Sequence, residues 1–268
     1  MPEGTDMRTA NVLSQAQAFY DREFSGEKYM APLTNSWPNL KRFVTEHNLV
    51  ESGKCIEFGC GRAENQDMVR DYTGTDISST VAKHFRPDKT FVQCSATDLP
   101  FPDNSFDGGW SIWVLEHVPE PEKMLSEIRR VIKPGGVVFL HPAWQVREWA
   151  ANGYPVRPYS DFGLRGKLIK ASVPLRNWIV WRSLFVFSNR FLRLLERTLS
   201  KAPTKFRFKR LTPNFEKFWM PDSDAMNKMD PYEAIVWFRS RGDEIIYPAS
   251  HLKQFLIRTN EICIRVRK

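Results

Sequence analysis

Short apolar segments alternate with polar segments of helical character between residues 54 and 141, and this alternation limits the chain to a few folds. Strands separated by crossover segments of this length are typical of a parallel sheet with helices on its faces. We therefore expect an α/β domain, and 268 residues are enough for one such domain with an elaboration or for two small ones. The segments that we interpret as strands are KCIEF (54–58), YTGTD (72–76), TFVQC (90–94), SFDGGWSIW (105–113) and VVFLH (137–141).

Helix signals flank these segments on both sides. NSWPNLKRFVTEHNL (35–49) predicts a helix with Asn35 or Ser36 as its N-cap. DPYEAIVWFRSRG (230–242) predicts another, in which Asp230 caps the first turn, Glu233 completes a capping box and Gly242 ends the helix. DEIIYP and EICIRVRK then predict two final strands.

The turn after the first strand, CIEFGCGRAEN (55–65), has glycine at two alternate positions behind an acidic residue. Turns of this shape bind dinucleotides, bind sulfonium nucleosides or serve as plain tight turns. A dinucleotide fingerprint requires a third glycine so that helix and strand pack closely, and Glu64 occupies that position. Because open α/β sheets bind ligands at the carboxyl ends of their strands, this turn is the first candidate for a binding site.

A more specific pattern follows the turn. Asp76 closes the second strand, 19 residues after Glu57, and Asp98 and Leu99 follow the third. The next stretch reads PFPDNSFDGGWSIWVLEHVPEPEKMLSEIRRVIKPGG. Together these motifs resemble the class I S-adenosylmethionine-dependent methyltransferases, in the type 11 branch with the pattern D-L-P-F … S-F-D … L-E-H-V … L-K-P-G-G. Ile132 replaces the last leucine, and the resemblance covers residues 35–143 and returns at 230–268.

This resemblance implies a Rossmann-like three-layer sandwich. The expected core is a seven-stranded, mostly parallel sheet with an antiparallel C-terminal hairpin, and a largely helical insertion follows the fifth strand. Residues 1–144 would form an N-terminal cap and the cofactor-binding part, residues 145–229 a basic and aromatic substrate-binding insertion or lid, and residues 230–268 the end of the domain. The implied cofactor is S-adenosyl-L-methionine.

The resemblance also implies which residues bind the cofactor. Glu57, Gly59, Cys60 and Gly61 match the first motif, in which glycines let the backbone approach the methionine and ribose parts. Ala63 departs mildly from the pattern, since many members have a third glycine there.

The remaining cofactor contacts follow in chain order. Asp76 would accept hydrogen bonds from the ribose, with Ile77 against the adenine. The segments expected at the adenine edge and at the sulfonium end contribute Ala96, Asp98 and Leu99, and Ser111 and Trp113. Tyr20 belongs to FYDREFSGEKY (19–29), which resembles a segment that closes over the cofactor and is equally consistent with a surface helix.

The insertion is the basic part of the chain. Residues 145–229 contain 17 Lys and Arg against 6 Asp and Glu, which favours an anionic partner or a solvated face. VPLRNWIVWRSLFVFSNRFLRLLERTLS predicts one or two amphipathic helices. Their aromatic face holds Trp178, Trp181 and Phe185, and their basic face holds Arg190, Arg193 and Arg197. Three interpretations remain open: a lid whose aromatic stripe packs on the sheet domain, a membrane-surface contact through 174–199, or a dimerisation arm.

Methyl transfer from a sulfonium is an in-line displacement, so the enzyme must place the nucleophile and supply a base if that nucleophile carries a proton. His141, at the end of the fifth strand, is the first candidate base, with a structural histidine as the alternative. Tyr154 and Tyr159 are further candidates, and His117 is expected to be structural. No metal is required, and no ligand cluster is evident.

The sequence thus predicts a methyltransferase acting on a small or lipid-linked anionic acceptor, such as a phosphate-bearing intermediate or a glycan. An RNA methyltransferase and a non-catalytic, cofactor-binding regulatory subunit remain as alternatives, and a homodimer is left open. The first 20 residues lack an apolar leader segment, no stretch reaches the about 18 apolar residues of a membrane span, and the four cysteines are scattered. We therefore expect a cytoplasmic protein with reduced thiols, peripheral at a membrane surface at most.

Overall fold

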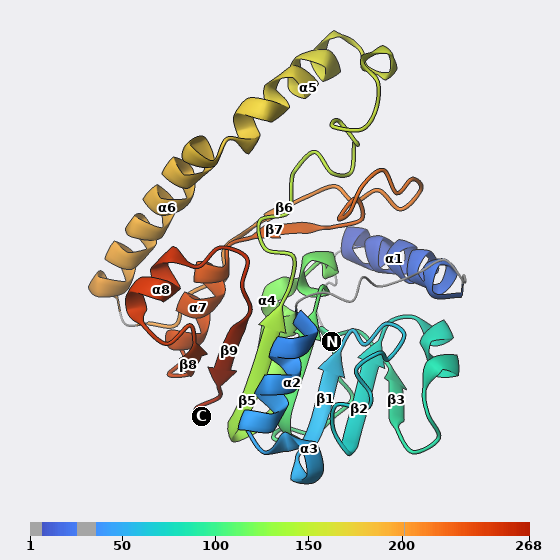
Figure 1. Ribbon diagram of the computed structural model, residues 1–268, viewed down its shortest axis with the longest axis vertical. Coiled ribbons are helices and arrows are strands. Elements are labelled where there is room, and N and C mark those ends of the chain that lie inside the picture. The colour runs from blue at the N-terminus through green and yellow to red at the C-terminus, as the bar shows by residue number, and fades with distance from the viewer. Residues whose placement is uncertain (1–6, 26–35, 201) are drawn as a thin grey trace.

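Seven strands form one sheet at the centre of the computed structural model, which describes residues 7–25, 36–200 and 202–268 (Figure 1). The strand order is β3-β2-β1-β4-β5-β9-β8; the first five strands in this order pair in parallel, and β9 pairs antiparallel with both β5 and β8. The strands are β1 (Lys54–Phe58), β2 (Asp71–Asp76), β3 (Thr90–Gln93), β4 (Phe106–Ile112), β5 (Ile132–His141), β8 (Glu244–Tyr247) and β9 (Ile262–Arg265). The predicted fold class is confirmed.

Helices and a small second sheet surround this core. The α-helices are α1 (Met7–Ser25), α2 (Ser36–Glu46), α3 (Leu49–Ser52), α4 (Pro121–Val131), α5 (Leu164–Asn177), α6 (Ile179–Leu199), α7 (Pro231–Arg239) and α8 (His251–Leu256). The 3-10 helices are η1 (Ser79–His84), η2 (Leu115–His117) and η3 (Tyr159–Asp161), and β6 (Phe208–Arg210) pairs with β7 (Asn227–Met229). None of the described helices is both long and apolar enough to cross a membrane.

Helices cover both faces of the sheet because successive strand residues point to opposite faces. On β5, Val137 and Phe139 belong to a buried cluster with residues of α2 and α3. Val138 and Leu140 belong to the opposite cluster, with residues of α4 and α7. The sheet is therefore the middle layer of three, as expected.

The connection between β1 and β2 differs from a regular crossover. Residues 61–70 form turns, and the connection from β2 to β3 contains only the 3-10 helix η1. Ala63 has a left-handed backbone (φ 57°), and Asn65 and Asp67 are turn-forming residues, so this stretch does not sustain an α-helix. These turns leave the end of β1 open at the edge where ligands bind.

The predicted caps are only partly confirmed. Asp230 caps α7, accepting a hydrogen bond from the backbone N–H of Tyr232 at 2.8 Å. Glu233 does not complete a capping box, because its carboxylate lies 3.0 Å from Nε of Arg193 in α6. Asn35 lies outside the described residues.

Helices α5 and α6 form a long arm along one side of the molecule (Figure 1). Arg190 and Arg193 of α6 are only 3% and 4% exposed, so the basic face points into the protein. Trp178 and Phe185 are 55% and 57% exposed, so the prediction that they pack on the sheet domain is wrong. The side chain of Trp181 lies outside what the structure describes.

Buried ion pairs attach α6 to the body. Nη2 of Arg190 lies 2.7 Å from Oδ1 of Asp230, and its guanidinium also donates to the carbonyls of Phe255 and Ile257. Arg193 pairs with Glu233 and donates to the carbonyl of Lys205 at 2.6 Å. Polar contacts thus hold a helix whose apolar residues face outward.

Arg190→Met should destabilise the protein strongly, because it removes the guanidinium that pairs with Asp230 and donates to two buried carbonyls. We expect a loss of about 3 kcal/mol in the free energy of unfolding, measured by urea titration. Arg176→Met, the same change at an exposed position of the arm, is the control and should cost under about 0.5 kcal/mol. Equal losses in the two variants would contradict the anchoring role.

Candidate functional site

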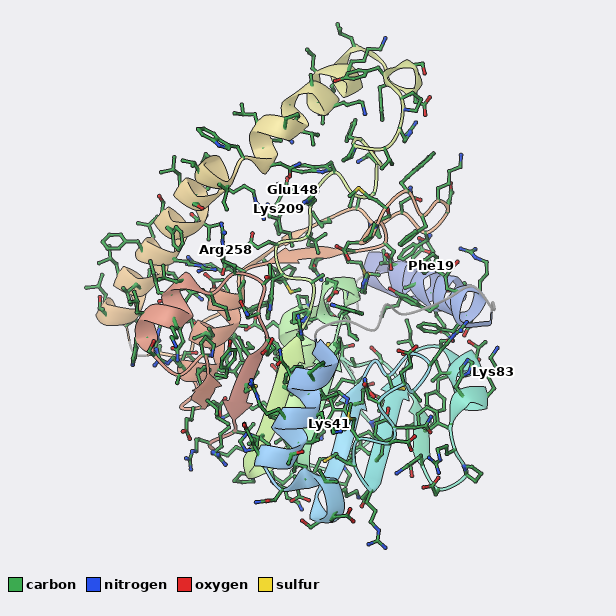
Figure 2. All side chains as sticks on the ribbon, viewed as in Figure 1. Phe19, Lys41, Lys83, Glu148, Lys209 and Arg258 are labelled. Carbon is green, nitrogen blue, oxygen red and sulfur yellow. The ribbon has the colours of Figure 1, made fainter. Side chains whose placement is uncertain are left out.

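A cavity of about 960 Å³ lies at the carboxyl ends of β1 to β4. Its walls come from the loops after these strands, from α1 and from residues 218–224 of the insertion. Helix α1 lies over the strand ends, with β6 and β7 beside it (Figure 1, Figure 2). A cavity of this size at this edge of the sheet is where α/β folds bind ligands.

The turn after β1 brings the backbone up to the cavity. The N–H groups of Gly59 and Cys60 both donate to the carbonyl of Thr75 on β2, at 2.8 and 2.9 Å. Gly59 has a left-handed backbone (φ 72°), and a Cβ at this position would overlap the side chain of Val114. Only glycine fits here, because the backbone is left-handed and Val114 occupies the space of a Cβ.

Asp76 ends β2 with a carboxylate that the same turn holds in place. Gly61 N–H donates to its Oδ2 at 3.0 Å, and Ser78 N–H donates to its Oδ1 at 2.9 Å. Burial raises the pKa of Asp76 to about 6, although these backbone donors oppose the shift. A carboxylate accepts up to about four hydrogen bonds, so it keeps acceptor capacity for the paired hydroxyls of a ribose.

Glu57 stabilises the turn from beneath. Tyr72 Oη donates to its Oε2 at 2.5 Å, and Asn65 Nδ2 donates to its Oε1 at 2.7 Å. Burial raises the pKa of Glu57 to about 7, against these hydrogen bonds. The side chain therefore ties the turn at residue 65 to β2 while also lining the cavity.

Most of the residues predicted to bind the cofactor lie around this cavity. The lining includes Tyr20, Glu57, Gly59, Cys60, Gly61, Asp76, Ile77, Ala96 and Trp113. Three others do not line it: Ser111 donates to the carbonyl of Phe58, Leu99 is part of the core, and Asp98 is exposed. These three occupy the expected segments, but their side chains have other contacts or face solvent.

Helix α1 bridges the two sides of the cavity. Tyr20 Oη donates to Oδ2 of Asp224 in the insertion at 2.7 Å, and Asp21 accepts from Ser78 Oγ after β2 at 2.6 Å. Phe19 and Phe24 are buried. The helix therefore covers the cavity over its described length, whereas residues 26–29 of the same predicted segment lie outside the described residues.

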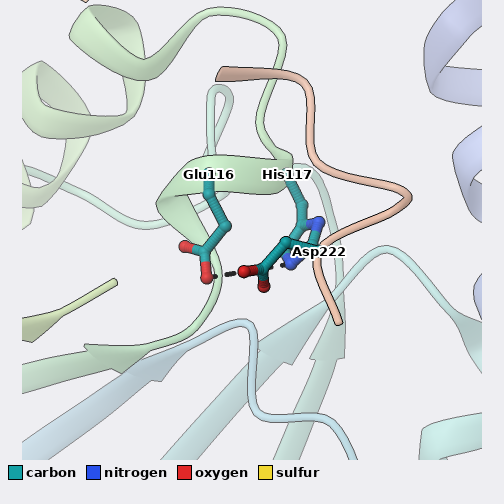
Figure 3. Close-up of side chains that lie close together, drawn as sticks. All are labelled: Glu116, His117 and Asp222. Carbon is teal, nitrogen blue, oxygen red and sulfur yellow. Dashed lines mark ion pairs between the residues drawn. The ribbon is translucent and has the colours of Figure 1, made fainter. Parts of the chain in front are cut away.

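A cluster of ionisable side chains occupies the end of β4 and the insertion (Figure 3). His117 Nδ1 lies 3.1 Å from Oδ2 of Asp224, and His117 Nε2 lies 3.8 Å from Oε1 of Glu116. Glu116 accepts from Ala143 N–H through Oε1, and its buried Oε2 has no hydrogen-bond partner. Glu116, His117 and Asp222 each offer one ligand atom within 4.8 Å of the others, so this cluster could hold a metal ion.

The protonation of this cluster follows from its pairing. Burial alone would lower the pKa of His117, but Asp224, Glu116 and Asp222 raise it to about 9. Burial would raise the pKa of Asp224, but His117 and Tyr20 lower it to about 2. At neutral pH the pair is an imidazolium and a carboxylate, and both residues line the cavity.

Sequence reasoning did not identify this cluster. Asp222 and Asp224 belong to the insertion, far along the chain from His117, and no local spacing links them. His117 was expected to be structural, and its contact with Asp224 gives it a structural role in addition to its place on the cavity wall.

The predicted catalytic residues lie elsewhere. His141 is not among the described residues that line the cavity; its Nδ1 lies 4.0 Å from Oε2 of Glu261, and burial lowers its pKa. Tyr154 stacks on Phe162 at 4.8 Å, and Tyr159 is exposed under the Lys170 ammonium. Both tyrosines thus lie near the start of α5 rather than at the cavity.

His117→Asn should destabilise the protein more at low pH than at high pH. Because folding raises the pKa of His117, its stabilising contribution is present below its unfolded pKa of about 6.5 and is lost as the pH rises through about 9. We expect the cost of the substitution to be about 1–3 kcal/mol larger near pH 6 than near pH 9.5 in urea unfolding. Asp224→Asn should remove the same pH dependence, and a pH-independent cost would contradict the pairing.

Comparison with known proteins finds similarity to methyltransferases. Residues 56–140 match the family described as "Methyltransferase domain". A demethylmenaquinone methyltransferase of Paenarthrobacter aurescens is 35% identical over 122 residues, 41% of this chain and 47% of that protein. Sterol 24-C-methyltransferase ERG6B of Gibberella zeae is 32% identical over 149 residues, 50% of this chain and 37% of that protein. A fatty-acid O-methyltransferase of Mycolicibacterium smegmatis is 32% identical over 115 residues, 37% of this chain and 42% of that protein.

These matches cover only part of this chain and part of each relative. The chain spans less than half the length of each of these three relatives, and the matched part includes the turn after β1, Asp76 and the residues up to the end of β5. The insertion lies beyond the residues that match the family. With the seven-stranded sheet described above, residues 56–140 belong to a methyltransferase domain of the class I, S-adenosylmethionine-dependent type.

Proposed function

We propose that this chain transfers a methyl group from S-adenosylmethionine to an apolar, lipid-like acceptor bound between α1 and residues 218–224. The observation that carries this proposal is the division of the cavity wall into two parts. One part is a glycine turn with a buried carboxylate, and the other combines apolar side chains with the His117 imidazolium and the carboxyl groups of Asp222 and Asp224.

The first part suits the cofactor. When bound, S-adenosylmethionine supplies a methyl group already activated by its sulfonium charge. Gly59 and Gly61 expose backbone to the cavity, and Asp76 offers acceptor capacity to the ribose hydroxyls. Because Gly61 N–H and Ser78 N–H hold this carboxylate before any ligand arrives, little ordering cost remains for binding.

The second part suits an apolar acceptor. Leu13, Ala16 and Phe19 of α1 line it, facing Phe218 and Pro221 of the insertion. The names of the three relatives give a demethylmenaquinone, a sterol and a fatty acid, and each of these molecules has a large hydrocarbon part. We therefore place the apolar body of the acceptor here.

The charge around the cavity does not favour an anionic acceptor. Its wall includes two arginines, Arg22 and Arg62, against six carboxyl side chains: Glu23, Glu57, Glu64, Asp76, Asp222 and Asp224. A phosphate-bearing metabolite or an RNA strand would meet this negative potential. The sequence led us to expect an anionic acceptor that is small or lipid-linked; we retain the lipid-like body and propose a neutral acceptor in place of the anionic one.

His117 is the residue placed to act on the acceptor. Its imidazolium can donate a hydrogen bond to an acceptor oxygen and stabilise the oxyanion, which lowers the pKa of a hydroxyl nucleophile. Asp222 lines the same wall, and burial raises its pKa, so it can accept the hydroxyl proton. If S-adenosylmethionine is held by the glycine turn and Asp76, it would supply the methyl group, and the deprotonated acceptor oxygen would be the nucleophile.

Calorimetric titration tests the cofactor half. S-adenosylmethionine and its demethylated product should bind, and NAD, the control, should not. Asp76→Ala should weaken binding by about 1.5–3 kcal/mol for each lost hydrogen bond to the carboxylate. Unchanged affinity in this variant would rule out Asp76 as the ribose ligand, and binding of NAD alone would rule out the cofactor.

Measuring the transfer of a labelled methyl group tests the proposed class of acceptor. We expect transfer to an apolar acceptor with a free hydroxyl, such as a demethylmenaquinol or a sterol, and none to a fatty-acid carboxylate or to RNA. His117→Asn should reduce kcat by about 10²-fold or more while cofactor affinity is unchanged. His141→Ala is the matched control and should leave kcat within about threefold. The reverse pattern would assign the base to His141, and cofactor binding without transfer to any acceptor would favour a regulatory subunit.

A further inference from the structure

Helix α6 has an outer face that is apolar along its length. Its buried arginines point into the protein, whereas Leu184, Phe185, Phe191, Leu192, Leu195 and Leu199 are between 43% and 88% exposed. Phe187 is an exception, since its ring stacks on Phe255 at 5.8 Å. This is the reverse of an ordinary surface helix, in which apolar residues pack on the core and cations face water.

The contacts of α6 explain how this arrangement is stable. Arg190 and Arg193 make their ion pairs with Asp230 and Glu233 at the start of α7. These polar contacts attach the helix without using its apolar residues. The outer face therefore stays available to a partner that can cover it.

Helix α5 has a related design. Leu164, Leu168 and Leu175 lie four and seven residues apart, on one exposed stripe. Exposed cations flank this stripe: Arg165 and Arg176 on one side, and Lys167 on the other. The helix contains no acidic residue. An apolar stripe between cations is the pattern of helices that lie in a membrane interface.

Charge identifies the partner of the arm, residues 164–199. The arm contains eight Lys and Arg and a single acid, Glu196. Arg190 and Arg193 are buried in ion pairs, and the exposed cations include Arg165, Lys167 and Arg176. In a symmetric contact between two copies, the same patch would face itself and these cations would repel each other. RNA would pair with the cations but would leave the leucines and phenylalanines in water. A lipid surface with anionic headgroups satisfies both features.

The width of the apolar face supports the same partner. A coiled-coil seam needs only a narrow stripe at heptad spacing. Phe185, Leu192 and Leu199 form a second row beside Leu184 and Phe191, which is wider than such a seam. Trp178 is exposed where α5 meets α6, and tryptophan favours the boundary between headgroups and acyl chains. We infer that the α5–α6 arm docks this protein on an anionic lipid surface.

Vesicle flotation of the full chain tests this inference, and it needs neither cofactor nor methyl transfer. The protein should float with phosphatidylcholine vesicles that contain phosphatidylglycerol, and far less with phosphatidylcholine alone. Leu184→Ser with Phe191→Ser should reduce the partition coefficient about tenfold or more. Leu252→Ser with Leu256→Ser is the matched control, because both leucines are exposed on α8 outside the arm, and it should float like the unchanged protein.

A variant without two exposed arginines of α5 tests the role of the cations in binding anionic lipid. Arg165→Glu with Arg176→Glu should reduce binding to the anionic vesicles by about fivefold or more for each cation removed, and should weaken its dependence on salt. The inference is overturned if the unchanged protein does not float with anionic vesicles, or if the α8 control loses binding as much as the arm variant. It is also overturned if sedimentation velocity shows a dimer that Leu184→Ser with Phe191→Ser converts to monomer, because the face would then be covered by a second copy.

Discussion

The site depends on one backbone constraint, the left-handed turn at the end of β1. Two successive N–H groups of this turn share the carbonyl of Thr75, so the end of β1 is fixed to the end of β2. The same turn aims Gly61 N–H at Asp76, which places the carboxylate without any side-chain partner. Because Val114 occupies the space where a Cβ of residue 59 would lie, the backbone path is determined by packing as well as by hydrogen bonds.

The positive charge of the insertion does not predict the charge of the cavity wall. The insertion is strongly basic, yet the described residues that line the cavity include six acids and two arginines. Two arginines of the insertion, Arg190 and Arg193, form buried ion pairs at the start of α7. The arginines of α5 lie on the outer arm. An anionic acceptor was therefore a reasonable expectation from composition, but composition does not say which surface the cations occupy.

Structural features that depend on neighbouring residues could be predicted from the sequence. The strands, the turn glycines and the Asp230 cap were predicted because each rests on neighbouring residues. Glu233 was misassigned to a capping box because its true partner, Arg193, lies on another helix. His141 does end β5 as predicted, but its ring lies near Glu261 instead of on the cavity wall. The acids of residues 222–224 could not be placed at all, since only the folded insertion brings them to His117.

The helix that covers the cavity, α1, contacts a segment that lies far along the chain. Tyr20 belongs to the first helix, and its hydrogen-bond acceptor, Asp224, comes from the end of the insertion. During synthesis, α1 leaves the ribosome long before residue 224, while domains made of earlier segments begin to fold. Phe24 belongs to a buried cluster with Cys60 and Val81, which are made early, whereas the contacts of Phe19 with Phe215 and of Tyr20 with Asp224 form only after the insertion has been made. The binding site is consequently among the last parts of the molecule to be assembled, and a protein cut short within the insertion would have strands β1 to β5 but no closed cavity.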